Sequence, residues 1–131
     1  MRANARALSF VCIAVVVVAG ALNVLDVFDD DSPWIPLGAL YFSSAALGID
    51  AMVRGVRKRT GVGPSIANLA PGGWTIFASM FWIVAVPAYF FGARRRVDDG
   101  APRDPITWGS WAAVVAFALL GILLACAPLV R

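Results

Sequence analysis

The stretch from Pro71 to Arg96 decides the fold, and its sequence is PGGWTIFASMFWIVAVPAYFFGARRR. Its apolar centre, residues 74–93, has about 20 residues, and a helix of that length rises about 30 Å, the thickness of a bilayer core. A proline and two glycines precede the first tryptophan, and three arginines follow the apolar residues. The stretch therefore predicts a membrane-spanning helix.

Similar apolar runs fill most of the remaining chain, at about residues 8–28, 34–53 and 106–129. Of the 131 residues, 60% are hydrophobic and 15% are charged, whereas soluble domains have about 45–50% apolar and about 25% charged residues. The charged residues gather between the runs. The sequence therefore predicts an all-α fold, a polytopic membrane protein whose four transmembrane helices form a single domain over residues 1–131.

The basic residues predict how the four spans are oriented. With four crossings, both termini and the connection at residues 54–73 lie on one side of the membrane. That side carries seven basic residues, and the other side carries Arg94, Arg95, Arg96 and Arg103. Because the cytoplasmic side is the more basic one, we expect a protein of the bacterial inner (cytoplasmic) membrane with both termini in the cytoplasm.

The arginines at residues 94–96 conflict with this orientation, because basic residues then flank both ends of the third segment. An alternative path resolves the conflict. The third segment enters the membrane, bends at Pro87 and returns, so that the chain spans three times. The four-span form remains the prediction, because a re-entrant backbone must be shielded by protein or water and so small a chain has little to shield it with.

Several residues of the spans are candidates for structural roles. Pro87 removes the N–H that would bond the carbonyl of Ile83, which predicts a kink. Small residues allow close helix approach, and tryptophan prefers the membrane interface. The candidates for helix packing are Ser44, Gly48, Ala112, Ala116, Gly121 and Ala125, and those for interface anchors are Trp34, Trp74, Trp108 and Trp111.

Polar residues within or near the spans are candidates for an ion or proton pathway. The main candidates are Asn23, Asp26 and Asp50. They are candidates because ionisable groups within a membrane commonly mark a transport path. The alternative is a structural role: Asp26 is close enough to a helix end to stay wet, and Asp50 can pair with Arg54, four residues further along.

The composition argues against catalysis. The chain has no histidine and no glutamate, and it shows no nucleophile–base pair, metal-ligand set or phosphate-binding loop. We therefore expect no enzyme, no catalytic or metal residue, no cofactor of its own and no small-molecule substrate. The net charge of +3 does not indicate nucleic-acid binding, because the basic residues flank apolar spans.

The third segment also carries a pattern of prolines and aromatic residues. Pro71 is followed by Trp74, by Trp82 eight residues later, by Pro87 and Tyr89, and then by Arg94. This pattern resembles a segment of small bacterial multi-span membrane proteins of unknown function. The resemblance covers about a third of the chain and implies a topology without an activity.

These observations favour a non-catalytic accessory or structural subunit at the periphery of a larger integral membrane complex. Such a subunit would contact membrane lipids, other membrane subunits or a second copy of itself, and a pigment or redox cofactor held by a partner. The alternatives are a small oligomeric channel or transporter and a membrane-perturbing effector. A channel would place one of the polar residues in its pathway.

Overall fold

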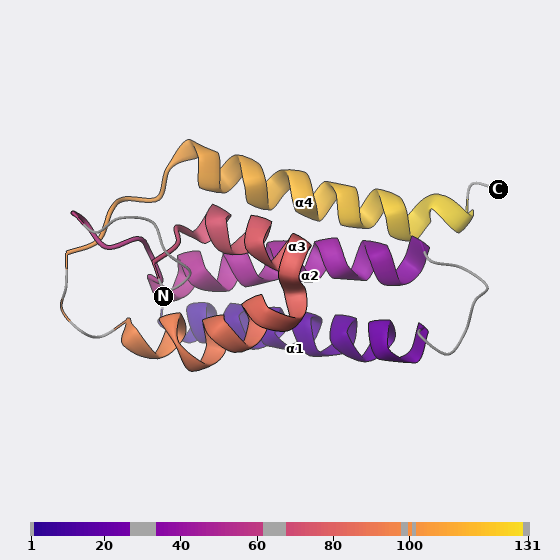
Figure 1. The fold of residues 1–131 in the computed structure, drawn as a ribbon, viewed down its shortest axis with the longest axis horizontal. Helices are drawn as coiled ribbons and strands as arrows, with labels where there is room; N and C mark the ends of the chain where they lie inside the picture. Colours follow the sequence, from indigo (N-terminus) through magenta and orange to yellow (C-terminus); the bar gives the residue numbers. More distant parts are fainter. Residues whose placement is uncertain (1, 27–33, 62–67, 98–99, 101, 130–131) are drawn as a thin grey trace.

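The computed structural model describes residues 2–26, 34–61, 68–97, 100 and 102–129 (Figure 1). Its elements are α1 (Arg2–Asp26), α2 (Trp34–Arg54), α3 (Pro71–Phe91), the 3-10 helix η1 (Ala93–Arg96), α4 (Trp108–Cys126) and the 3-10 helix η2 (Ala127–Leu129). Within these described ranges, four helices are long and apolar enough to cross a membrane. The prediction of an all-α fold with four such helices is confirmed.

The end of α2 shows how local sequence shapes the chain. Gly55 has a φ of +72°, a conformation that glycine adopts without steric cost. Its N–H donates to the carbonyl of Met52 at 3.3 Å, and the N–H of Val56 donates to that of Ala51 at 2.8 Å. This pair of bonds is a Schellman motif. It ends the helix and turns Val56 back into the apolar core.

α2 is the central helix of the bundle. Figure 1 shows α1 along one side of α2 and α4 along the other, with α3 packed over part of their length. Helix α4 approaches α2 closely, since a Cβ on Gly38 would lie 2.6 Å from the backbone of both Gly121 and Ala125. A Cβ on Gly48 would meet Thr75 of α3 and, at 2.7 Å, Val114 of α4. Glycine therefore sets the spacing of the central helix.

α3 reverses its direction instead of running straight. Phe81 has non-helical backbone angles, with φ −134° and ψ +52°. On either side of it, the rings of Trp74 and Tyr89 meet edge to face with centroids 5.2 Å apart. In a straight helix these residues would be separated by about 22 Å along the axis. α3 is therefore a helical hairpin of two limbs, as Figure 1 shows.

α3 begins and ends at the same end of the bundle, because its second limb returns to the level at which the first one starts. The segment after α2 pairs with the segment before α4: the N–H of Thr60 donates to Pro102 at 3.1 Å, and that of Asp104 donates to Lys58 at 2.8 Å. In a path with four crossings these segments would lie on opposite sides. Of the two paths considered from the sequence, the described geometry follows the re-entrant one.

The hairpin reaches about halfway along α2. Near the reversal, the indole Nε1 of Trp82 donates to Ser43 at 3.0 Å. Ser43 lies about 16 Å from the Arg54 end of α2, which is roughly half of a bilayer core. The non-helical residue of α3 is Phe81, so the bend of the re-entrant path lies there and not at Pro87, while a kink at Pro87 itself stays a prediction. Proline removes one hydrogen bond from a helix, but its φ remains compatible with helical backbone.

Candidate functional site

A buried carboxylate joins three segments at the end of the bundle where α3 begins and ends. Asp50 of α2 is 1% exposed. Its Oδ1 accepts a hydrogen bond from Ser9 of α1. Its Oδ2 accepts one from the hydroxyl of Tyr89 at 2.5 Å and one from Nε of Arg94 at 3.1 Å. The return limb of α3 and η1 are therefore tied to both α1 and α2.

Ser9 links the same carboxylate to a second arginine. Its Oγ accepts from Nε of Arg54 at 3.0 Å and from Nη2 of Arg94 at 3.2 Å, while it donates to Asp50. We call Ser9, Asp50, Arg54, Tyr89 and Arg94 the Asp50 cluster. The cluster neutralises a charge that is costly in a membrane, and every carboxylate oxygen in it has a partner. The cluster therefore serves to hold α1, α2 and the return limb of α3 together.

The sequence predicted that Asp50 can pair with Arg54, but the ion pair in the structure is a different one. Asp50 pairs with Arg94, while Arg54 reaches Ser9 instead. Arg94 lies 44 residues further along the chain, so only the folded hairpin brings it to α2. No local spacing in the sequence reports such a contact.

Asn23 and Asp50, two of the three residues predicted to form a polar pathway, do not come together. Asn23 donates to the carbonyls of Ala19 and Pro36 at 2.7 and 3.3 Å, and Pro36 lies about 21 Å along α2 from Asp50. Asp26 is the last residue of α1, and its side chain lies outside the described part. The buried core between these ends is mainly apolar, with Cys12, Val16, Ala46 and Leu47.

Four of the six residues predicted for packing lie between helices. Ser44 and Gly48 are buried in α2, and Gly121 and Ala125 meet it from α4. Ala112 and Ala116 are exposed, so they do not pack between helices of this chain, and their packing against a partner stays a prediction. The buried positions of α4 are Ser110, Val114 and Gly121. Residues two positions away point to the opposite face of a helix.

Of the four tryptophans predicted as interface anchors, three are exposed and one is buried. Trp34, Trp108 and Trp111 are exposed near helix ends, where interface anchors belong. Trp74 was predicted as a fourth anchor, and this is wrong because its side chain is fully buried. The hairpin encloses it, with Phe77 on one limb and Tyr89 on the other.

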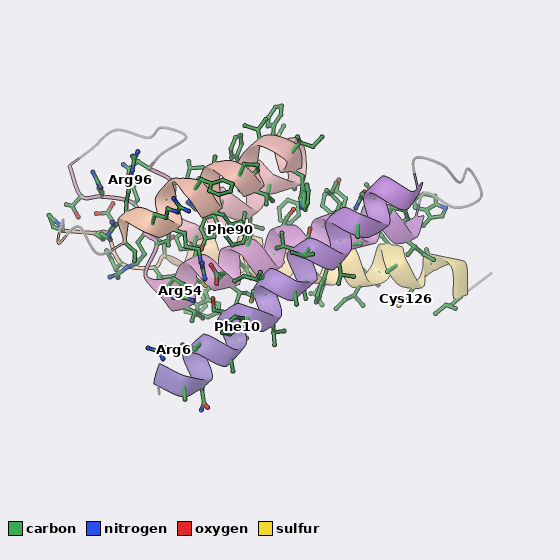
Figure 2. The ribbon with its side chains drawn as sticks, turned by 90° about the horizontal axis from the view of Figure 1, so that it is seen from below. Arg6, Phe10, Arg54, Phe90, Arg96 and Cys126 are labelled. Atoms are coloured by element: carbon green, nitrogen blue, oxygen red, sulfur yellow. The ribbon has the colours of Figure 1, made fainter. Side chains whose placement is uncertain are left out.

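The end of the bundle with the Asp50 cluster is strongly basic. Figure 2 shows Arg6, Arg54 and Arg96 toward this end and Cys126 at the opposite one. The Lys and Arg residues with described side chains belong to the start of α1, the end of α2 and the segment after it, η1, and the segment before α4: Arg6, Arg54, Arg57, Lys58, Arg59, Arg94, Arg95, Arg96 and Arg103. The charge conflict that the four-span path creates is therefore absent from the described geometry.

A groove lies at the tip of the hairpin, on the half of the bundle that α3 does not cover. Its volume is about 550 Å³, and its walls include Asn23 of α1, Leu40 of α2 and residues 79–84 of α3. Met80 and Ile83 at the tip are 69% and 83% exposed. Large apolar side chains therefore surround an open groove at mid-depth.

Among the described residues, no group of three or more His, Cys, Asp or Glu gathers as a metal site. The chain was compared with protein-family models, with curated proteins and with solved structures, and none of them matches it. The resemblance of the third segment to small bacterial membrane proteins stays a prediction.

Proposed function

We propose that this chain is a non-catalytic accessory subunit of a larger integral membrane complex, and that the tip of the α3 hairpin meets its partner. The proposal rests on the reversal of α3 at Phe81, which lies at a level about halfway along α2. A hairpin that ends at mid-depth places backbone polar groups where lipid offers no hydrogen bonds. Such backbone is tolerated only where protein or water shields it.

The surroundings of the tip support this proposal. The groove of about 550 Å³ beside residues 79–84 is open, and its rim exposes large apolar side chains such as Met80 and Ile83. A transmembrane helix of a partner fits such a surface, because it fills the uncovered half of the bundle and shields the reversal. The Asp50 cluster, whose hydrogen bonds are internal, supports a structural role for the basic end.

We further infer the orientation in a bacterial inner membrane. With α3 re-entrant, the chain crosses three times, so its termini lie on opposite sides. The described basic side chains gather at the end where α1 starts, and basic residues stay in the cytoplasm. The N-terminus is then cytoplasmic and the C-terminus is outside, which revises the expectation of two cytoplasmic termini.

Purification from native membrane in a gentle detergent, with mass spectrometry of what accompanies the chain, tests the accessory role. We expect larger membrane proteins in fixed ratio. A photo-crosslinking residue at Ile83 should reach the same proteins, whereas one at Val17, an exposed residue of α1, should reach them much less. A pure homo-oligomer with no crosslink to another protein would contradict the proposal.

A second candidate is a small oligomeric channel or transporter, which the hairpin itself favours. Half-membrane helices build the ion and substrate sites of many transporters. In that case several copies would shield the tips of one another. Ion flux into liposomes that is lost on Asp50→Asn, in protein that still folds, would support this function over the accessory role.

A further inference from the structure

A small cavity at the basic end of the bundle is lined by hydrogen-bond donors. It has a volume of about 10 Å³ and lies between the segment after α2, the start of α3 and η1. Arg57, Arg59, Trp74, Arg96 and Arg103 contribute to its walls. Four arginines and one tryptophan thus line a space that admits about one water-sized group.

Two of these donors are buried without an acceptor among the described residues. They are Nε1 of Trp74 and Nε of Arg57. The side chain of Trp74 is fully buried, so bulk water does not reach its N–H. Buried polar groups in native proteins are nearly always hydrogen-bonded, and each exception calls for an explanation.

Two backbone carbonyls beside the cavity already accept hydrogen bonds. Arg103 donates from Nη1 to the carbonyl of Arg57 and from Nη2 to that of Arg96, both at 2.8 Å. These bonds fix Arg103 across two segments that meet at the cavity. Trp74 and Arg57 therefore offer a ligand two buried N–H groups, one of them on a cation, and this combination favours an anion.

We propose that the cavity binds one oxygen of a phosphate group, supplied by an anionic lipid headgroup. Trp74 and Arg57 donate to this oxygen through Nε1 and Nε. The volume accepts a single oxygen, and the rest of the phosphate stays at the rim, where Arg96 is exposed. Trp74 lies in the first turn of α3 and Arg57 three residues beyond α2, the level of lipid headgroups at a basic membrane face.

Indole N–H resonances of ¹⁵N-tryptophan-labelled protein test this proposal. The resonance of Trp74 is the one lost in Trp74→Phe, and if that variant fails to fold, substitution of the other four tryptophans assigns it by elimination. In nanodiscs, replacing part of the phosphatidylcholine with phosphatidylglycerol should move the Trp74 resonance downfield. The resonance of Trp82, which donates to Ser43, should not move.

Two matched variants separate the cavity from general charge. Arg57→Met removes the unpaired Nε and keeps a similar length, and it should weaken the response to phosphatidylglycerol roughly tenfold, the value of one charge-assisted hydrogen bond. Arg95→Met removes the same charge from an exposed residue that lies over Phe91. It should weaken the response by less than about twofold.

Inorganic phosphate and chloride, each added to phosphatidylcholine nanodiscs, distinguish the sources of the anion. A Trp74 shift with phosphatidylglycerol at lower concentrations than with either free ion supports a lipid site. A shift with a free ion and none with phosphatidylglycerol would overturn the lipid assignment. An unchanged Trp74 resonance in every arm would mean that water satisfies the two donors, and would overturn the proposal.

Discussion

At residue scale, Asp50 determines how the hairpin is held. Its carboxylate faces Ser9, Tyr89 and Arg94, which come from three separate parts of the chain. Removing one partner of a buried charge pair leaves the other charge uncompensated, and this is far more costly than losing a surface pair. A neutral amide at position 50 would therefore leave Arg94 without its counter-charge.

We expect Asp50→Asn to lower the free energy of unfolding by about 3 kcal/mol. Asp104→Asn is the matched control, because Asp104 accepts a hydrogen bond from Thr60 in an exposed setting at 2.8 Å, and its loss should cost less than about 1 kcal/mol. Unfolding in mixed micelles, followed by fluorescence, measures both variants. Equal effects of the two substitutions would show that the cluster does not hold the hairpin.

Substituting two glycines by alanine gives a second prediction at the residue scale. In Gly48→Ala the new methyl group meets Thr75 and Val114, and such overpacking costs about 1–3 kcal/mol. In Gly109→Ala the nearest atom is Oγ1 of Thr107, at an ordinary 3.7 Å. That substitution should stabilise by up to about 1 kcal/mol, because alanine favours helix. The same unfolding experiment checks the opposite signs, and a neutral Gly48→Ala would contradict the packing.

At the scale of elements, α3 shows what sequence can and cannot predict. Its apolar run predicts a helix, and residues 71–91 are helical apart from the reversal at Phe81, which divides them into two shorter limbs. The run does not report the reversal at Phe81, because both a straight and a folded helix place apolar side chains in lipid. The contacts that distinguish them, Trp74 with Tyr89 and Asp50 with Arg94, join residues far apart in sequence.

α4 shows a related limit. It is apolar on all sides, so its sequence has no polar face to mark which side meets lipid. Small residues at Ala112 and Ala116 were as plausible for packing as those at Gly121 and Ala125. The neighbouring glycine of α2, Gly38, decides between them, since it admits the backbone of Gly121 and Ala125 at close range.

Spin labels test the path of α3 directly. In a variant without native cysteines, labels at Ile76→Cys and Phe91→Cys should lie clearly closer together than labels at Trp111→Cys and a restored Cys126. Both pairs are fifteen residues apart and exposed, but only the second pair lies on a straight helix, which separates them by about 22 Å. Similar distances in electron–electron double resonance would mean that α3 is straight.

At the scale of the whole molecule, the path of α3 decides how often the chain crosses the membrane. The sequence predicted spanning helices at nearly the right places, yet the orientation depends on where the arginines at 94–96 lie. Once α3 returns, Arg94 joins Asp50 and the pair is neutral. Orientation could not be read from charge counts alone, because the counts depend on the path.

A chain that crosses the membrane three times has its two termini on opposite sides of the membrane, and this can be tested. A cysteine at Ala3, near the start of α1, should react with an impermeant maleimide only from the cytoplasmic side, and one at Leu129 only from the outer side. Both positions are exposed, and the native cysteines are replaced in both variants. Labelling of intact cells and of inverted vesicles compares the sides. Labelling of both positions from one side would restore the four-span form.

The pairing of the segment after α2 with the segment before α4 also bears on how the protein is made. If the chain crosses three times as proposed, α1 and α2 would enter the membrane during synthesis as a packed pair of helices. In the proposed three-span form, α3 would then pack against this unit through Asp50, and the arginines at residues 94–96 would not have to cross the bilayer. In that form α4 would be the last of the described helices to cross the membrane, and it would do so in the outward direction.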